Sequence, residues 1–192
     1  SRVMYWLAKH YLRLRGWTIN GTFPPDPKFI AIGAPHTANF DFVVFLGVLG
    51  HFGKRARFIG KASLFKGPLG WLMRKLGGIP VQRDHPEGLV GQTAAAFAEA
   101  HEMILVLAPE GTRGRSTMWK SGFYHIALAA GVPVLPASIS GADKTIVIGS
   151  PLNASGDVAA DMDVIRAFFD GVEGIQPGNE TPVLLAEEGE VE

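Results

Sequence analysis

The chain has 192 residues, and its 18 lysines and arginines balance its 18 aspartates and glutamates, so the formal net charge is zero. This length suits one domain with a substantial core, and the balance excludes the broad basic field typical of nucleic-acid-binding proteins. The absence of cysteine excludes disulfides, thiolate metal sites and thiol catalysis. No run approaches the ~18 apolar residues that a membrane-spanning helix needs.

Residues 2–16 predict an amphipathic helix with basic charge. One side of a helical wheel carries apolar side chains and the opposite side carries cations: Val3, Met4, Leu7, Tyr11 and Leu14 against Arg2, Lys9 and Arg13. Such a helix either docks its apolar face on the domain core or lies in a membrane interface with its cations near the headgroups. The pattern leaves both readings open, and the two can coexist.

The next segments predict strands alternating with helices. Short apolar runs, typical of strands covered on both faces, occur at 29–32, 57–59, 79–82, 104–107, 132–139 and 145–148. Helices are expected between them at about 39–52, 62–76, 86–101, 119–130 and 157–173. Prolines within the runs indicate edges, ends or bulges: Pro80, Pro133 and Pro136.

This alternation predicts an α/β fold: a single layered domain with a mixed, largely parallel sheet flanked by helices, plus the N-terminal amphipathic helix. We expect the domain to span residues 1–186. Residues 187–192 are rich in glutamate and are expected to form a solvated, poorly ordered acidic tail.

The first polar cluster, residues 36–41, follows the strand-like run 29–32. His36 lies in the expected loop, and Asp41 falls near the first turn of the next helix, where the helix dipole favours a carboxylate. If the loop folds back, Asp41 meets one ring nitrogen of His36 and leaves the other free as a general base. From the pair alone, the favoured interpretation is a surface histidine beside an aspartate that merely supports a helix start, since both residues are common.

The second cluster, residues 109–115, follows the strand-like run 104–107. Its glycines allow tight turns and a close backbone approach to a ligand. Arg113 and Arg115 are suited to bidentate contacts with phosphate, and the Thr112 hydroxyl adds a donor. Arg83 is a third candidate cation, although Asp84 beside it is an alternative partner.

Four sequence blocks together resemble a known family. His36 and Asp41 match the H-x4-D signature of the glycerophosphate and lysophosphatidate acyltransferases, the PlsC-like family. Residues 78–83 (GIPVQR) resemble the second block, 109–113 (PEGTR) the third and 132–136 (VPVLP) the fourth. The blocks occur in the family's order over residues 30–140, and the order is far more specific than any one block.

The resemblance implies acyl transfer from acyl-CoA or acyl carrier protein to a hydroxyl of a phosphate-bearing lipid acceptor, with no cofactor. His36 would be the general base and Asp41 its orienting partner. Substrate binding would involve several residues of the second and third blocks: Arg83, Glu110, Gly111, Thr112 and Arg113. The fourth block would be structural.

The acceptor is the least determined part of this hypothesis. Pro35, Pro80, Gln82 and Gly114 depart from the residues usual in the family, and these blocks line the acceptor pocket. The first choice is 1-acylglycerol 3-phosphate, giving phosphatidic acid. Glycerol 3-phosphate or another lipid, such as an amino-acid lipid or a glycolipid, is the alternative.

Two further classes compete with acyl transfer: a non-catalytic lipid-binding protein and a thioesterase. The intact set of candidate catalytic residues favours an enzyme, and the lack of a G-x-S-x-G elbow favours a general base over a serine nucleophile.

The histidines show no metal-ligand spacing, so we expect no metal. Without a signal-peptide pattern, we expect a cytoplasmic protein, peripheral at the inner face of the membrane.

Overall fold

A seven-stranded sheet forms the centre of the molecule. The computed structural model describes residues 2–81 and 88–189, and the strand order is β1-β7-β6-β2-β5-β3-β4. All neighbouring pairs are parallel except β6 and β7, which confirms the predicted mixed, largely parallel sheet. The strands are β1 (Thr18–Asn20), β2 (Lys28–Ala34), β3 (Arg57–Lys61), β4 (Gly78–Val81), β5 (Met103–Leu107), β6 (Val134–Ser140) and β7 (Thr145–Ile148).

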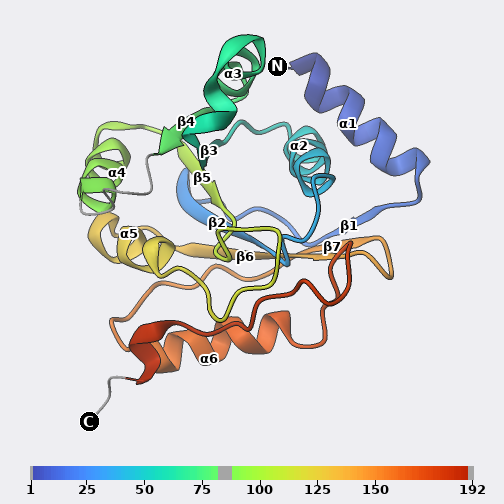
Figure 1. Ribbon diagram of the computed structural model, residues 1–192. Helices are drawn as coiled ribbons and strands as arrows, with labels where there is room; N and C mark the ends of the chain where they lie inside the picture. Colours follow the sequence, from blue (N-terminus) through green and yellow to red (C-terminus); the bar gives the residue numbers. More distant parts are fainter. Residues whose placement is uncertain (1, 82–87, 190–192) are drawn as a thin grey trace.

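Helices cover both faces of the sheet, which makes the fold a three-layered α/β domain (Figure 1). One face packs against α1 (Arg2–Leu14), α2 (Asp41–Phe52) and α3 (Gly67–Lys75). The other face packs against α4 (Leu89–Glu99), α5 (Gly122–Ala130) and α6 (Val158–Phe169). Two short 3₁₀ helices, η1 (Ala62–Phe65) and η3 (Ala186–Gly189), complete the set of helices among the described residues.

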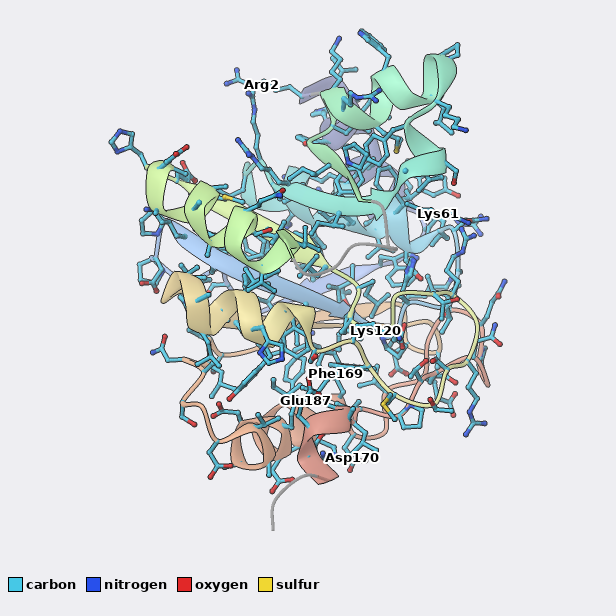
Figure 2. All side chains as sticks on the ribbon, turned by 60° about the vertical axis from the view of Figure 1, so that its left-hand side comes forward. Arg2, Lys61, Lys120, Phe169, Asp170 and Glu187 are labelled. Atoms are coloured by element: carbon cyan, nitrogen blue, oxygen red, sulfur yellow. The ribbon has the colours of Figure 1, made fainter. Side chains whose placement is uncertain are left out.

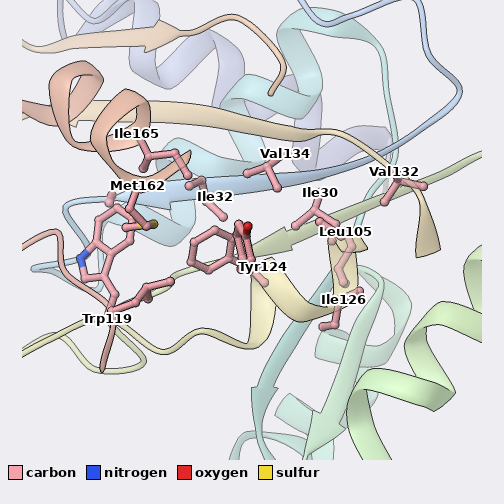
Figure 3. Packing of buried hydrophobic residues seen from close by; sticks show 14 of the residues in the cluster. Ile30, Ile32, Leu105, Trp119, Tyr124, Ile126, Val132, Val134, Met162 and Ile165 are labelled. Atoms are coloured by element: carbon pink, nitrogen blue, oxygen red, sulfur yellow. The ribbon is translucent and has the colours of Figure 1, made fainter. Parts of the chain in front are cut away.

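The side chains of the central strand β2 alternate between two hydrophobic cores. Ile30 and Ile32 belong to the core under α4, α5 and α6, whereas Phe29 and Ala31 belong to the core under α1 and α2. Figure 3 shows Tyr124 of α5 next to these β2 side chains in the first core. This period of two is the geometry of a strand buried on both faces.

Tyr124 also ties α5 to the start of α6. Its hydroxyl donates to Oδ2 of the buried Asp161 at 2.7 Å, and the Ser155 backbone N–H donates to the same oxygen at 2.7 Å. Burial, followed by the hydrogen bond to Asp161, raises the pKa of Tyr124 to about 12. The phenol is therefore neutral and serves as a donor.

Helix α1 docks on the core, but with a different face from the one that the wheel predicts. Tyr5, Ala8 and Leu12 are buried against α2. Most of the predicted apolar side is instead exposed: Val3, Leu7, Tyr11 and Leu14, together with Trp6. The helix has two apolar faces, and the docked one contains smaller and partly polar side chains that the wheel weighted less.

Two glycines on α2 allow α1 to approach closely. A Cβ at Gly47 would lie 2.2 Å from Cδ1 of Leu12, and one at Gly50 would lie 2.3 Å from the backbone oxygen of Tyr5. The second contact is with backbone, which a change of side-chain rotamer does not relieve. Glycine at position 50 is therefore required for this helix–helix distance.

Several predicted boundaries differ from the structure. The expected helix 62–76 is divided into η1 and α3, because Lys66 is extended and Gly67 has a φ of +58° before Pro68. The sequence analysis missed β1, a three-residue edge strand. Helix α6 ends at Phe169 rather than 173, since Asp170 leaves the helical region and Gly171 has a φ of +69°.

The first residues of the expected acidic tail, Glu187 and Glu188, lie in η3. There Glu188 accepts hydrogen bonds from Arg166 and from the Leu185 backbone N–H. Residues 190–192 lie outside the described residues. Within the part of the chain that the structure describes, no helix is both long and apolar enough to cross a membrane.

Gly50→Ala tests the close approach of α1 and α2. Alanine normally stabilises a helix interior by up to ~1 kcal/mol relative to glycine. At position 50 we expect the reverse, a loss of ~1–3 kcal/mol in the free energy of unfolding, because the new methyl group overlaps the Tyr5 backbone. Gly91→Ala on α4, with nothing within 4 Å of the added Cβ, is the matched control. Equal stabilisation of both variants in denaturant unfolding would contradict the packing argument.

Candidate active site

The two polar clusters meet at the carboxyl edge of the sheet. β2 and β5 are parallel neighbours with Ile32 opposite Leu107, so the loops that follow them leave the sheet side by side. We call residues 35–40 the His36 loop and residues 108–121 the Glu110 loop. Ligand sites of α/β sheets collect at this edge, where strand order reverses around the central strand.

His36 and Asp41 form a hydrogen-bonded pair, the contact that the loop geometry predicted. Nδ1 of His36 lies 2.9 Å from Oδ2 of Asp41, and the same oxygen accepts the Ala38 backbone N–H at 2.8 Å. Asp41 is 4% exposed and His36 30% exposed. Because a carboxylate only accepts, the proton of the neutral ring lies on Nδ1, and Nε2 carries the free lone pair.

Glu110 holds the His36 loop from the other side. Its Oε2 accepts the His36 backbone N–H at 2.6 Å, and the side chain is only 2% exposed. Burial raises the pKa of the Glu110 carboxyl, although the backbone N–H groups of His36 and Thr181 partly offset this effect. The carboxyl therefore braces the backbone beside the imidazole, a contact that the sequence did not predict.

The rest of the third block forms an exposed turn beside this pair. Gly111 has a φ of +67°, a value that favours glycine, and its N–H donates to the Ala108 carbonyl at 3.0 Å. The Thr112 hydroxyl accepts the Gly114 N–H at 3.3 Å. Arg113 is exposed on this turn, where it is accessible to an anionic ligand. Arg83 lies outside the described residues, so its expected place in the site stays a prediction.

Sequence reasoning missed the contribution of the C-terminal segment, residues 171–185. Its Gln176 N–H donates to Oγ1 of Thr37 at 3.0 Å, and Oγ1 of its Thr181 accepts the Ser116 N–H at 3.0 Å. A Cβ at Gly174 would lie 2.6 Å from the same Thr37 oxygen. The segment contains turn residues but no recognisable motif, and only its position in space reveals the contacts.

No cofactor site emerges from the described side chains. Among residues 2–81 and 88–189, no group of three or more histidine, aspartate or glutamate side chains is placed to hold a metal ion. The expectation that neither metal nor cofactor takes part stays a prediction. What the arrangement offers is a supported imidazole, an exposed arginine on the turn that follows Glu110 and a polypeptide scaffold that fixes both loops.

Comparison with known proteins places this geometry in context. Over 103 residues the chain is 34% identical to a chloroplastic 1-acyl-sn-glycerol-3-phosphate acyltransferase of Brassica napus, covering 51% of this chain and 30% of that protein. Over 89 residues it is 35% identical to the 1-acyl-sn-glycerol-3-phosphate acyltransferase of Escherichia coli K12, covering 43% of this chain and 36% of that protein. The chain thus spans about a third of the length of these curated relatives.

A solved structure shares the fold. The crystal structure of the 1-acyl-sn-glycerophosphate acyltransferase PlsC from Thermotoga maritima matches with a TM-score of 0.61 and 22% sequence identity, over 86% of this chain and 76% of that one. The family model described as Acyltransferase matches residues 18–140, which include β2, both site loops and the strands around them. By this match, the chain belongs to the acyltransferase family.

Proposed function

We propose that this protein transfers a fatty acyl group from a thioester, acyl-CoA or acyl carrier protein, to the free hydroxyl of 1-acylglycerol 3-phosphate. The observation that carries the proposal is the His36–Asp41 pair, buried at its carboxylate and open at its imidazole, on the edge where the first and third sequence blocks meet. The relatives named for this reaction support the choice of acceptor.

The proposed chemistry begins at Nε2 of His36, which removes the proton of the acceptor hydroxyl as its oxygen attacks the thioester carbonyl. Asp41 holds the ring in the required tautomer and stabilises the imidazolium that forms. When the tetrahedral intermediate collapses, the new ester C–O bond is complete and the C–S bond breaks. The imidazolium then protonates the leaving thiolate, which restores the neutral base.

The Glu110 contact explains how the base keeps its position. The buried carboxyl restrains the His36 backbone, while Asp41 restrains the ring, so both ends of the residue are held. Misplacement of a catalytic group by about 1 Å costs on the order of 10²-fold in rate. Two anchors on one residue therefore support its proposed role as the base.

Arg113 is the cation that we expect to bind the acceptor phosphate. It is exposed on the turn that follows Glu110, and its guanidinium matches a phosphate with two parallel hydrogen bonds. In this arrangement the phosphate contact fixes the acceptor while His36 activates its hydroxyl. Arg83 remains a second candidate for the same phosphate.

His36→Ala should reduce kcat for acyl transfer by about 10²–10⁴-fold, the usual contribution of a general base. Thermal unfolding should be little changed, because the ring is partly exposed. His51→Ala is the matched control, since His51 is an exposed histidine at the far end of α2. Near-normal turnover by a folded His36→Ala protein would remove His36 from the mechanism.

Arg113→Ala should raise the KM for 1-acylglycerol 3-phosphate at least tenfold, because a charge-assisted contact of about 1.5–3 kcal/mol is lost. The KM for the acyl donor should stay the same. Arg57→Ala is the control: it removes an exposed arginine from the amino end of β3, at the opposite edge of the sheet. A change in donor KM alone would show that the phosphate binds elsewhere.

We also propose that the protein works at a membrane surface. The free face of α1 exposes Trp6 and Leu14, and α3 exposes Leu69 and Trp71. The start of α1, marked by Arg2, and α3 lie at the same end of the molecule in both views (Figures 1 and 2). Lys75 lies over the Trp71 ring at 4.6 Å, which combines a cation with an exposed aromatic ring. Such a surface suits an anionic bilayer interface.

The double variant Trp6→Glu, Trp71→Glu should lower binding to vesicles that contain anionic lipid by at least about tenfold. Each tryptophan loses apolar burial worth roughly 1.5–3 kcal/mol and gains repulsion from the headgroups. Both side chains are exposed, so the fold should persist. Val164→Glu, at a similarly exposed position on α6 at the opposite end of Figure 1, is the control. Equal vesicle sedimentation of all three proteins would refute this surface.

A further inference from the structure

The C-terminal segment, residues 171–185, closes a cavity against both site loops. The cavity has a volume of about 270 Å³. It lies beside Pro35, which precedes His36, and beside Glu110, which accepts the His36 backbone N–H. The C-terminal segment lies beyond residues 18–140, which the family model matches. The lining residues are Ala34, Pro35, Glu110, Arg115, Trp119, Phe169, Val172, Glu180, Thr181, Pro182 and Val183.

Hydrogen bonds hold the C-terminal segment in place. Glu180 accepts the backbone N–H groups of Gly174 at 2.9 Å and Gly178 at 2.7 Å. Burial opposes ionisation of Glu180, but these N–H groups and the nearby Arg115 charge together lower its pKa. Contacts with Thr37 and Ser116 then join the segment to the His36 loop and the Glu110 loop. The cavity wall is therefore built into the site.

One polar atom of the lining residues lacks a partner. Trp119 is 3% exposed, and its Nε1 makes no hydrogen bond among the described residues. An indole N–H only donates, so it needs an acceptor such as a carbonyl oxygen. Unpartnered buried donors are uncommon and call for an explanation, which a ligand that carries a carbonyl group supplies.

The lining chemistry narrows the class of ligand. Two carboxylates, Glu110 and Glu180, against a single arginine disfavour a phosphate. A hydrocarbon chain would leave the Trp119 N–H unpaired and would desolvate the carboxylates without compensation. A neutral chain with both N–H donors and carbonyl acceptors suits the carboxylates, the indole and the apolar walls together. The volume lies just below the ~300–1,000 Å³ of whole-ligand pockets, which suits a slender part of a ligand.

We propose that this cavity is the subsite for the amide-bearing pantetheine arm of the acyl donor, the group that coenzyme A and acyl carrier protein share. The inference rests on the proposed function, in which the donor is a thioester. Only a short ethylene link separates the thioester sulfur from the first amide, so the arm's subsite must begin close to the base. The cavity meets this requirement, because Pro35 and Glu110 form its wall next to His36.

The arm would enter between the Glu110 loop and the C-terminal segment. Figure 2 shows Phe169, at the end of α6, near Lys120 of the Glu110 loop in the same part of the molecule. Phe169 and Val183 provide apolar wall for the carbon chain of the arm, and the Trp119 indole donates to an amide carbonyl. The donor specificity of the enzyme would thus depend on residues outside the four sequence blocks.

Indole NMR tests the subsite without any need for turnover. The chain has four tryptophans and therefore four indole N–H signals. Trp6→Phe, Trp17→Phe and Trp71→Phe assign three signals and leave the fourth to Trp119. Titration of the unmodified protein with pantetheine should shift the Trp119 signal until it saturates, with the other three unmoved. The chain has no cysteine, so the pantetheine thiol cannot form a disulfide with it.

Coenzyme A and glycerol 3-phosphate are the comparison ligands in this titration. We expect coenzyme A to move the Trp119 signal as pantetheine does. A response to coenzyme A alone would assign the cavity to the nucleotide, and a response to glycerol 3-phosphate alone would assign it to the acceptor; either result overturns the proposal, as does no response. A shift with pantetheine in a protein that transfers no acyl group would refute the proposed function but keep the subsite.

Steady-state kinetics give an independent readout. Val183→Phe fills the cavity and should raise the KM for acyl-CoA at least tenfold while the KM for the acceptor is unchanged. Val164→Phe, on the exposed side of α6, is the matched control. Trp119→Phe removes one hydrogen bond and should raise the donor KM about fivefold. An effect of Val183→Phe on the acceptor KM alone would overturn the assignment.

Discussion

The site depends on the parallel pairing of β2 with β5. The register that sets Ile32 opposite Leu107 delivers the His36 loop and the Glu110 loop to the same edge. Only there can the buried Glu110 carboxyl accept the His36 backbone N–H at 2.6 Å, 74 positions away in the chain. A one-residue slip would turn every β2 side chain to the opposite core, so the hydrophobic alternation of Ile30 and Ile32 against Phe29 and Ala31 also protects the site geometry.

The molecule combines a hydrogen-bonded candidate site with surfaces of different chemistry around it. On one side of the sheet, α1 docks through Tyr5 and Leu12 and keeps a second apolar face exposed. On the other side, the C-terminal segment borders a small cavity beside Glu110 whose walls combine carboxylates and an arginine with apolar side chains. Under the proposed function, a lipid acceptor and a thioester donor would approach His36 from these two separate directions.

Much of the fold was predictable because both faces of the sheet are covered. Strands such as Met103–Leu107 are then near-continuous apolar runs, and the helices between them follow by length and periodicity. The prediction failed where local signals were weak or divided. β1 has three residues, α1 has two apolar faces, and the Lys66–Pro68 break falls within a continuous apolar pattern. Glu187 and Glu188 looked like tail residues because their hydrogen-bond partners His125 and Arg166 are remote in sequence.

The sequence by itself determined the family blocks and the alternation of strands and helices. It also allowed the close His36–Asp41 contact, because a loop of five residues before a helix start can bring that pair together. Only the tertiary structure decided how the His36 loop is braced and what surrounds it. Glu110 reaches His36 from the loop after the neighbouring strand β5, and Gln176 reaches Thr37 from 139 positions away. The local sequences of these segments do not predict the contacts, because only the tertiary fold brings the segments together.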